Sequence, residues 1–214
     1  MGNVLDVCEV LKFGENNEIK IDFIGRGNIW IKNTYKNDVI SLARYILKEA
    51  ILNTAPGQLK VTGLDSDLSA LFAPFSSLSS GDAKKLEFLS DIKALEFHLD
   101  FLGEHIQAVQ NEIQGKDGSL TAFRRRTGKP AQSYRFVVLV LNLSMVENKF
   151  LAKLSTILKK GPAAGVSFMI IPANNRITGG LTPHHLDDKI TFIKPDGNRI
   201  VLLDHDGEPK NTAV

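Results

Sequence analysis

The densest apolar stretch of the chain runs from Phe136 to Leu143 and is interrupted only by Asn142. It has three valines and no alternation of polar and apolar positions, which is typical of a strand buried on both faces of a parallel sheet. The apolar residues of 150–158 recur at helical spacing, and that pattern ends at Gly161-Pro162. A second apolar run, Val166 to Ile171, follows. Strand, helix and strand in about 35 residues predict a right-handed βαβ unit.

Residues 18–32 carry two short strand patterns. Apolar and polar residues alternate from Ile19 to Phe23, and a second apolar run, Asn28 to Ile31, follows a turn bounded by two glycines. Two strands joined by a short turn that contains glycine are typical of a hairpin, so we expect an N-terminal β-hairpin here. A helical stripe over 38–51 and a strand pattern over 58–64 come next.

The longest helical pattern covers 82–114, where apolar residues recur every three or four positions. A helix of this length would extend about 50 Å at about 1.5 Å per residue, which is longer than a small sheet needs. We therefore expect it to bend, to break at Gly103 or to project from the domain. His98 and His105 lie seven positions apart, so we expect them on one partly exposed face of this helix.

The last part of the chain is polar after Pro172 until two short strand patterns, 189–193 and 199–203, which flank a Pro-Asp-Gly-Asn turn. The final residues, 204–214, are expected to form a flexible tail. The 214 residues, of which 43% are apolar and 23% charged, are typical of one globular domain, here spanning 1–214.

The composition excludes several classes of protein. A single cysteine, Cys8, allows no internal disulfide framework and suits a reducing compartment. No apolar stretch approaches the roughly 20 residues that span a bilayer, so we expect no membrane span. The net charge of +2 by itself indicates no particular partner. These features favour a cytoplasmic protein.

One dense basic cluster precedes the apolar strand, in a stretch that we expect to be a loop. Such a cluster can contact nucleic-acid phosphates, or it can be a solvated loop, which is the more common case. The candidate DNA-binding residues are Arg124, Arg125, Arg126 and Lys129. Histidines and aspartates also gather at 184–188 and 204–206, but they match no metal-ligand spacing, so we expect no metal site.

Residues 152–172 read AKLSTILKKGPAAGVSFMIIP, a helical pattern that ends in Lys-Gly-Pro-Ala-Ala-Gly before an apolar strand. This segment resembles the FtsK/SpoIIIE branch of the FtsK–HerA ATPases, which have basic-Gly-Arg-Ala-Ala-Gly there, with Pro162 in place of the arginine. The order of elements over 18–200 also resembles that family. The resemblance implies an α/β fold: a RecA-like, P-loop NTPase-type three-layer sandwich with a mostly parallel central sheet.

The same resemblance places a phosphate-binding loop between the strand 28–31 and the helix that follows it. Such a loop needs Gly-x-x-x-x-Gly-Lys-Ser/Thr, because the glycines let backbone N–H groups surround the phosphates and the lysine pairs with them. The corresponding stretch, 32–39, has no glycine and places an acid near the helix start. The residues at this position are Asn33, Thr34, Lys36, Asn37 and Asp38.

Two further catalytic positions implied by the resemblance also lack the usual side chains. The acidic pair that holds Mg²⁺ and positions the attacking water corresponds to Asn142 and Leu143, and the polar sensor after the next strand falls near Ala173. None of these residues brings a charge. Because phosphoryl transfer depends on positioning and electrostatics, we expect no hydrolysis and neither ATP nor Mg²⁺ as a cofactor.

Two functions remain open. The first is a catalytically inactive FtsK-like domain, a structural or regulatory assembly module that docks on copies of itself, on an active FtsK-like motor subunit or on DNA. The second is an atypical ATP-binding ATPase of the DNA translocase type, which would use Lys36 together with Asp65 or Asp67.

Overall fold

The computed structural model describes residues 7–14, 19–32, 36–79, 86–113, 115–129, 132–142, 146–173, 189–197 and 199–210. The elements, in chain order, are β1 (Val10–Phe13), β2 (Ile19–Asp22), β3 (Asn28–Ile31), α1 (Lys36–Leu52), β4 (Leu59–Asp65), η1 (Ala73–Ser79), β5 (Leu86–Phe88), α2 (Ile92–Ile113), α3 (Leu120–Thr127), β6 (Tyr134–Leu141), α4 (Asn148–Lys160), η3 (Pro162–Ala164), β7 (Val166–Pro172), β8 (Ile190–Asp196) and β9 (Arg199–Leu203).

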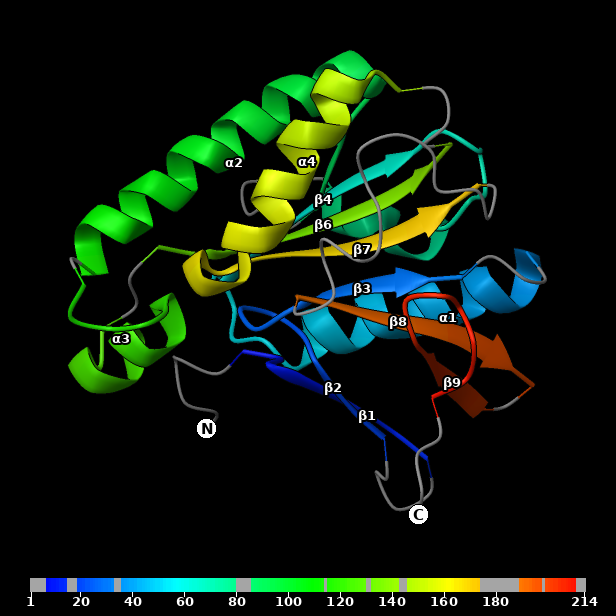
Figure 1. The fold of residues 1–214 in the computed structure, drawn as a ribbon, viewed down its shortest axis with the longest axis horizontal. Helices are drawn as coiled ribbons and strands as arrows, with labels where there is room; N and C mark the ends of the chain where they lie inside the picture. The colour runs from blue at the N-terminus through cyan, green and yellow to red at the C-terminus, as the bar shows by residue number, and fades with distance from the viewer. Residues whose placement is uncertain are drawn as a thin grey trace.

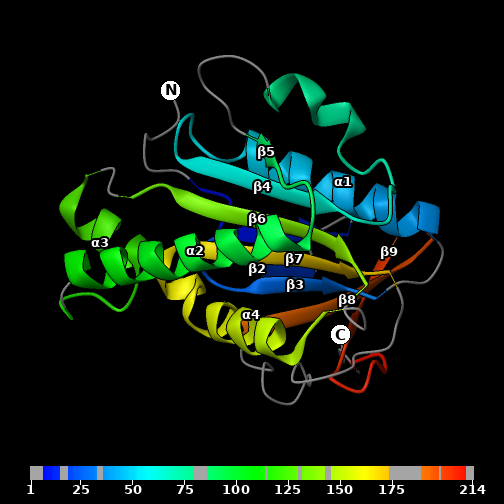
Figure 2. The ribbon, with the colours of Figure 1, turned by 90° about the horizontal axis from the view of Figure 1, so that it is seen from above.

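The described strands form a central sheet in the order β5-β4-β6-β7-β3-β8-β9 and a separate two-stranded sheet, β1-β2. All neighbouring strands of the central sheet are parallel except β8 and β9, which are antiparallel. Helices α2 and α4 cover one face of this sheet, whereas α1 and the β1-β2 hairpin lie on the other (Figures 1 and 2). The predicted three-layer α/β sandwich with a mostly parallel sheet is confirmed.

The predicted βαβ unit is present as β6, α4 and β7. The two strands pair in register from Arg135↔Val166 to Leu141↔Pro172. Every residue of β7 is buried, as is every residue of β6 except Arg135, which is intermediate. These strands are mostly apolar because both faces of the sheet are covered.

A buried asparagine fixes β3 beside this unit. Asn28 is 0% exposed, and its Nδ2 donates to the carbonyl oxygens of Leu158 and Lys189, each at 3.0 Å. Its Oδ1 accepts a hydrogen bond from the amide of Phe168 at 2.9 Å. All three bonds join β3 to elements distant in sequence, so this side chain sets the position of the strand that leads to α1.

The expected pairing of the N-terminal strands is wrong. A hairpin is present, but β2 pairs with β1, in the register Val10↔Asp22 to Phe13↔Ile19, and β3 joins the central sheet instead. The burial pattern gives the reason: the side chains of Asn28–Ile31 are all buried, whereas those of Ile19–Asp22 alternate. A strand without alternation belongs between two layers of helices.

The long helix begins later than expected. Residues 86–88 form β5, which pairs in parallel with β4, and α2 starts at Ile92. The helix does not project, because its buried residues recur from Leu95 to Ile113. Lys153 of α4 also reaches Asp100 of α2, with the Nζ and Oδ1 atoms 2.6 Å apart.

Three smaller expectations are also corrected. The basic stretch around 124–126 is the helix α3 and not a loop. The tail is folded through residue 210, because Pro209 bridges to Leu203 and the Asp204 carboxylate accepts the amides of residues 206 and 208. His105 is buried, at 6% exposure, where a partly exposed helix face was expected.

Candidate functional site

The parallel sheet brings several polar residues to one edge. Strands β3, β4, β6 and β7 all end there, and we call the residues that directly follow these strands the carboxyl edge. In open α/β sheets ligands bind outside the carboxyl ends of the strands, so the site implied by the sequence resemblance falls in the right place. Of the residues expected there, Asn33, Thr34 and Leu143 lie outside the described residues.

Lys36 is the first residue of α1, and it is already paired. Its Nζ atom lies 2.9 Å from the Oδ2 atom of Asp67, which follows β4. The two side chains are 58% and 43% exposed, so the pair contributes at most about 1 kcal/mol to stability. Asn37 and Asp38 are exposed in the same turn of the helix. The lysine at the position of the phosphate loop is therefore paired with a carboxylate from the segment after β4.

Lys32, which directly follows β3, is paired too. Its Nζ donates to the carbonyl oxygen of Gly207 at 3.1 Å, so the C-terminal turn reaches the end of β3. Gly207 has a φ of +84°, and a Cβ atom there would lie 2.9 Å from the same Nζ. Sequence patterns gave no sign of this contact, because the two residues are 175 positions apart.

The loop after β4 is fixed by its own side chains. Both carboxylate oxygens of Asp65 accept hydrogen bonds from Ser69, from the amide at 3.0 Å and from the hydroxyl at 2.9 Å. Arg44 of α1 donates to the carbonyl oxygens of Ala70 and Leu71, at 2.7 and 3.2 Å. These bonds hold Ala70 at a φ of +58°, a conformation that costs about 1–3 kcal/mol for a residue other than glycine. Both carboxylate oxygens of Asp65 therefore take part in hydrogen bonds within the loop.

Hydrogen bonds to carbonyl oxygens of β6 join the end of this strand to the residues that follow β4 and β7. The amide and the hydroxyl of Ser66 donate to the carbonyl oxygen of Val140, at 3.0 and 2.9 Å. The amide of Ala173 donates to the carbonyl oxygen of Leu141 at 3.0 Å. Asn142 follows β6 as a half-buried amide, so neither Asn142 nor Ala173 brings an ionised group to the carboxyl edge.

The structure separates the three candidate DNA-binding arginines. Arg124 is 1% exposed, stacks 4.7 Å from the centroid of the Tyr134 ring and donates to Gln58. Its Nε and Nη1 atoms have no hydrogen-bond partner among the residues that the structure describes. A guanidinium this buried presents almost no surface to a duplex phosphate, and in this structure Arg124 contacts Tyr134 and Gln58 instead.

The other two arginines are more exposed but are held in ion pairs. The Nη2 atom of Arg125 lies 2.5 Å from Glu9, and that of Arg126 lies 2.7 Å from Asp117. The bond to Arg126 holds the pKa of the Asp117 carboxyl below its usual value. Consecutive helical residues point about 100° apart, which explains why one run of arginines reaches three different segments. Lys129 is exposed beyond the end of α3.

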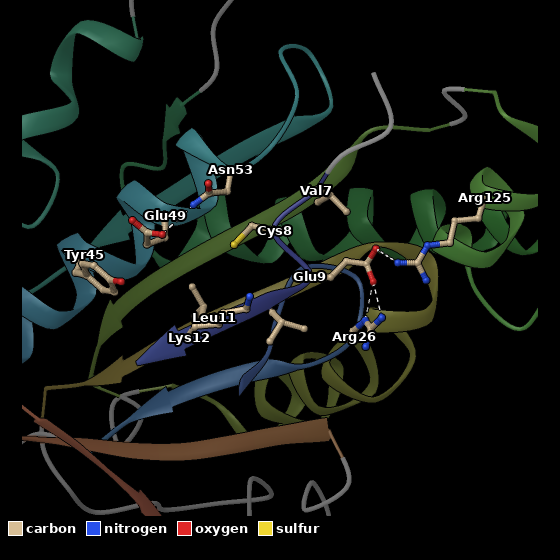
Figure 3. Close-up of a pocket in the computed structure, with 11 residues that line it drawn as sticks. Val7, Cys8, Glu9, Leu11, Lys12, Arg26, Tyr45, Glu49, Asn53 and Arg125 are labelled. Carbon is tan, nitrogen blue, oxygen red and sulfur yellow. Dashed lines mark hydrogen bonds and ion pairs between the residues drawn. The ribbon is translucent and has the colours of Figure 1, made fainter. Parts of the chain in front are cut away.

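A pocket that the sequence did not indicate lies between the N-terminal strand segment and α1 (Figure 3). Its volume is about 570 Å³. The Glu9 carboxylate lies on one side, where it also accepts a hydrogen bond from Arg26 Nε at 2.7 Å. Tyr45 and Glu49 of α1 line the opposite side. Burial, and secondarily Glu49, raise the pKa of the Cys8 thiol to about 11, so this cysteine is a poor nucleophile.

Burial, with a smaller contribution from Arg135, lowers the pKa of His105 to about 4. Among the described residues no group of three or more His, Cys, Asp or Glu side chains could hold a metal ion, and 184–188 lie outside them. No helix within the described ranges is long and apolar enough to cross a membrane.

Comparison with known proteins gives structural matches but no sequence matches. No family model and no curated protein matches the chain. The pCW3 conjugation coupling protein TcpA, in its monomer form with ATPγS, matches with a TM-score of 0.63 and 14% identity over 87% of this chain and 54% of its own. EssC (ATPases 2 and 3) from Geobacillus thermodenitrificans matches with a TM-score of 0.64 and 16% identity over 91% of this chain and 38% of its own.

A third match is Thermomonospora curvata EccC (ATPases 2 and 3) in complex with a signal sequence peptide. Its TM-score is 0.59 and its identity 12%, over 96% of this chain and 40% of its own. The chain therefore spans about half, or less, of the length of these three proteins. At these identities the likeness establishes the architecture. Together with the strand order and the carboxyl edge, it shows that this chain has an FtsK-like P-loop ATPase fold.

Proposed function

We propose that this chain is a non-hydrolysing FtsK-like domain that acts as a structural or regulatory module in an assembly of such domains. The observation that carries this proposal is the Lys36–Asp67 ion pair at the carboxyl edge. In an active phosphate loop the lysine stays available for the phosphates. Here a carboxylate takes that place, at 2.9 Å from the Nζ atom.

The electrostatics of this edge oppose a triphosphate. Asp67 and Asp38 both lie close to the first turn of α1, where they add negative charge next to the helix N-terminus. The N-terminus of a helix favours negative charge, and these two carboxylates already supply it. Mg²⁺ binding in such sites uses carboxylates together with substrate phosphates. Asn142 supplies only an amide where the resemblance implies an acid.

The partner is proposed from the architecture. Two of the matching structures each contain ATPases 2 and 3 of a longer protein, and this chain covers 38% and 40% of them. A domain of this fold therefore occurs beside another in one polypeptide. We infer that this chain docks either on copies of itself or on an active FtsK-like motor subunit.

Association with DNA stays a prediction. Since Arg124 is buried, the surface available for phosphates is reduced to Arg125, Arg126 and Lys129, and two of these already have acidic partners. If the chain binds duplex DNA through this surface, Arg125→Ala weakens binding and lowers its salt dependence.

A thermal-shift measurement tests the proposal. A ligand at 100 times its Kd stabilises a protein by about 2.7 kcal/mol, so even weak binding of millimolar ATP·Mg²⁺ would raise the melting temperature. We expect no shift for the parent protein and none for Lys36→Ala, the matched control. A shift in the parent that is absent in Lys36→Ala would overturn the proposal.

The alternative, an atypical ATPase, would use the same two residues in another role. The structure brings Lys36 together with Asp67, one of the two acids expected to serve in that role, whereas Asp65 is engaged by Ser69. The two functions differ in their response to Asp67→Asn. The alternative requires ATP turnover in the parent and its loss in the variant, whereas the main proposal requires no turnover in either protein.

A further inference from the structure

The pocket beside β1 has an unpaired strand edge as one wall. In the two-stranded sheet, the amide of Phe23 donates to the carbonyl oxygen of Glu9 at 2.8 Å. Because hydrogen bonding alternates along an antiparallel pair, Leu11 and Phe13 bond to β2, and the backbone groups of Val10 and Lys12 point to the other side. Both residues line the pocket. No described strand occupies this edge of β1.

We propose that this pocket binds an extended segment of a partner polypeptide, which adds to the free edge of β1 as a third strand. Strand addition of this kind obtains affinity from main-chain hydrogen bonds and selectivity from alternate side chains. The proposal is independent of whether the carboxyl edge binds nucleotide, because neither Lys36 nor Asp67 lines the pocket.

The space available agrees with a short strand. Four residues at about 3.3 Å each, in a strand about 4.8 Å wide and a layer about 10 Å thick, occupy on the order of 600 Å³. The pocket measures about 570 Å³. The strand that it would extend, β1, is itself four residues long.

The charges around the edge define the chemistry of the segment. Lys12 lies directly opposite Lys20 in the β1-β2 register, an arrangement of like charges that is unfavourable, and both side chains are exposed. An acidic residue of the partner segment, placed beside Lys12, would reduce the repulsion between the two lysines. On the α1 side, the Glu49 carboxylate accepts only an amide bond, from Asn53 at 2.8 Å, and pairs with no described cation. A basic residue of the partner segment that points toward α1 would pair with the Glu49 carboxylate.

The expected partner segment is therefore an extended peptide with acids on its outer side and one base on its inner side. Arg26 and Arg125 do not select it, because the Glu9 carboxylate already pairs with both. Edge strands that stay unpaired are usually protected by charge or by a covering element. A pocket with a hydrogen-bonding wall and unpaired charges is instead suited to an incoming strand.

Fluorescence anisotropy with a labelled heptapeptide, Glu-Val-Glu-Lys-Thr-Val-Thr, tests this inference on the full chain. The decisive variants are Lys12→Pro and Lys20→Pro. Each removes one lysine and one amide at the same paired position, but only the first lies on the pocket edge. Proline is tolerated on an edge whose N–H faces outward. We expect Lys12→Pro to weaken binding about tenfold, as the loss of a hydrogen bond and a charge pair would, and Lys20→Pro to change it much less.

Two further probes cover the case in which Lys12→Pro fails to fold. The same peptide with N-methylated backbone amides, and the charge-reversed peptide Lys-Val-Lys-Glu-Thr-Val-Thr, should both bind the parent protein more weakly by about tenfold. Absence of binding at peptide concentrations on the order of 1 mM would overturn the inference. Equal binding of the N-methylated peptide, or equal weakening by the two proline variants, would overturn it as well.

Discussion

The β6-α4-β7 unit and the carboxyl edge belong to the same sheet, yet they are built by different interactions. The unit is held by buried apolar side chains, with Phe136, Val138 and Phe168 all 0% exposed. The edge is held by exposed ion pairs and loop hydrogen bonds, of which Lys36–Asp67 is an example. Burial of large apolar side chains contributes about 1.5–3 kcal/mol each, whereas an exposed ion pair contributes about 0–1 kcal/mol.

The difference explains how a fold can persist when the residues for a reaction are replaced. Replacing the charged residues at the ends of strands costs little stability, because those groups are solvated before and after the change. Replacing a large apolar residue inside the strands costs about 2–5 kcal/mol. Substitutions inside the β6-α4-β7 unit should therefore lower the free energy of unfolding several-fold more than substitutions at the carboxyl edge. We expect nucleotide binding in neither set of variants.

The largest effect is expected within the unit. Phe136 is completely buried, and its ring packs edge-to-face on Phe23 with centroids 4.9 Å apart. We expect Phe136→Ala to lower the free energy of unfolding by about 3–5 kcal/mol, since it removes this contact and leaves a cavity. Urea denaturation followed by circular dichroism measures the change. A loss below about 1 kcal/mol would show that the unit is not the centre of stability.

The next effect is a loss of stability in acid through His105. Its pKa is about 4 in the folded protein because of burial, against 6.5 for the free side chain. The unfolded chain therefore binds a proton first as the pH falls below 6.5, and the folded state loses up to about 3 kcal/mol between pH 6.5 and 4.

This pH effect is isolated by comparison with a variant. His105→Leu lacks the titrating group, so its stability should fall less steeply between pH 6.5 and 4 than that of the parent. The exposed carboxylates titrate in both proteins and cancel in the difference. Parallel curves for the two proteins would contradict the assignment.

Asn28 gives a third effect, of about 3 kcal/mol, because Asn28→Ala removes the partner of the Leu158 and Lys189 carbonyl oxygens and of the Phe168 amide. Its matched control is Asn37→Ala on the exposed first turn of α1, which we expect to change stability by less than about 0.5 kcal/mol. The ratio of the two effects, measured by denaturant unfolding, sharpens the contrast between interior and edge.

The smallest effect is expected at the carboxyl edge itself. Asp67→Asn removes the partner of Lys36 and should change the free energy of unfolding by less than about 1 kcal/mol. The variant should also fail to bind ATP·Mg²⁺, because freeing the lysine does not create the glycine-rich backbone that surrounds phosphates. Strong destabilisation by Asp67→Asn would show that the edge does contribute to the fold.

The sequence predicted what depends on local pattern and missed what depends on distant contacts. The strand at Phe136 and the helix that follows it were predictable, because their periodicity is contained in about ten residues. Arg124 was expected on the surface because arginine usually is, but it is buried against Tyr134 of β6 and Gln58, which precedes β4. The sequence pattern predicted β5 as part of the long helix, because a strand of three residues is too short to give a periodic signal.

The candidate site shows the same division. The positions of Lys36 and Asn142 at one edge could be predicted, because parallel strands end together. The pairing of Lys36 with Asp67, 31 positions away, and of Glu9 with Arg125, 116 positions away, required the fold. No local pattern indicated the pocket beside β1, since it joins residues of the N-terminal strand, α1 and α3.

The most direct test of the central claim is isothermal titration calorimetry of the parent protein with ATP·Mg²⁺. If the charges and the loop at the carboxyl edge exclude nucleotide, the heats will equal those of dilution up to ATP concentrations on the order of 1 mM. A saturable one-to-one binding curve that Lys36→Ala abolishes would contradict the account, because it would mean that the lysine leaves Asp67 to bind phosphate.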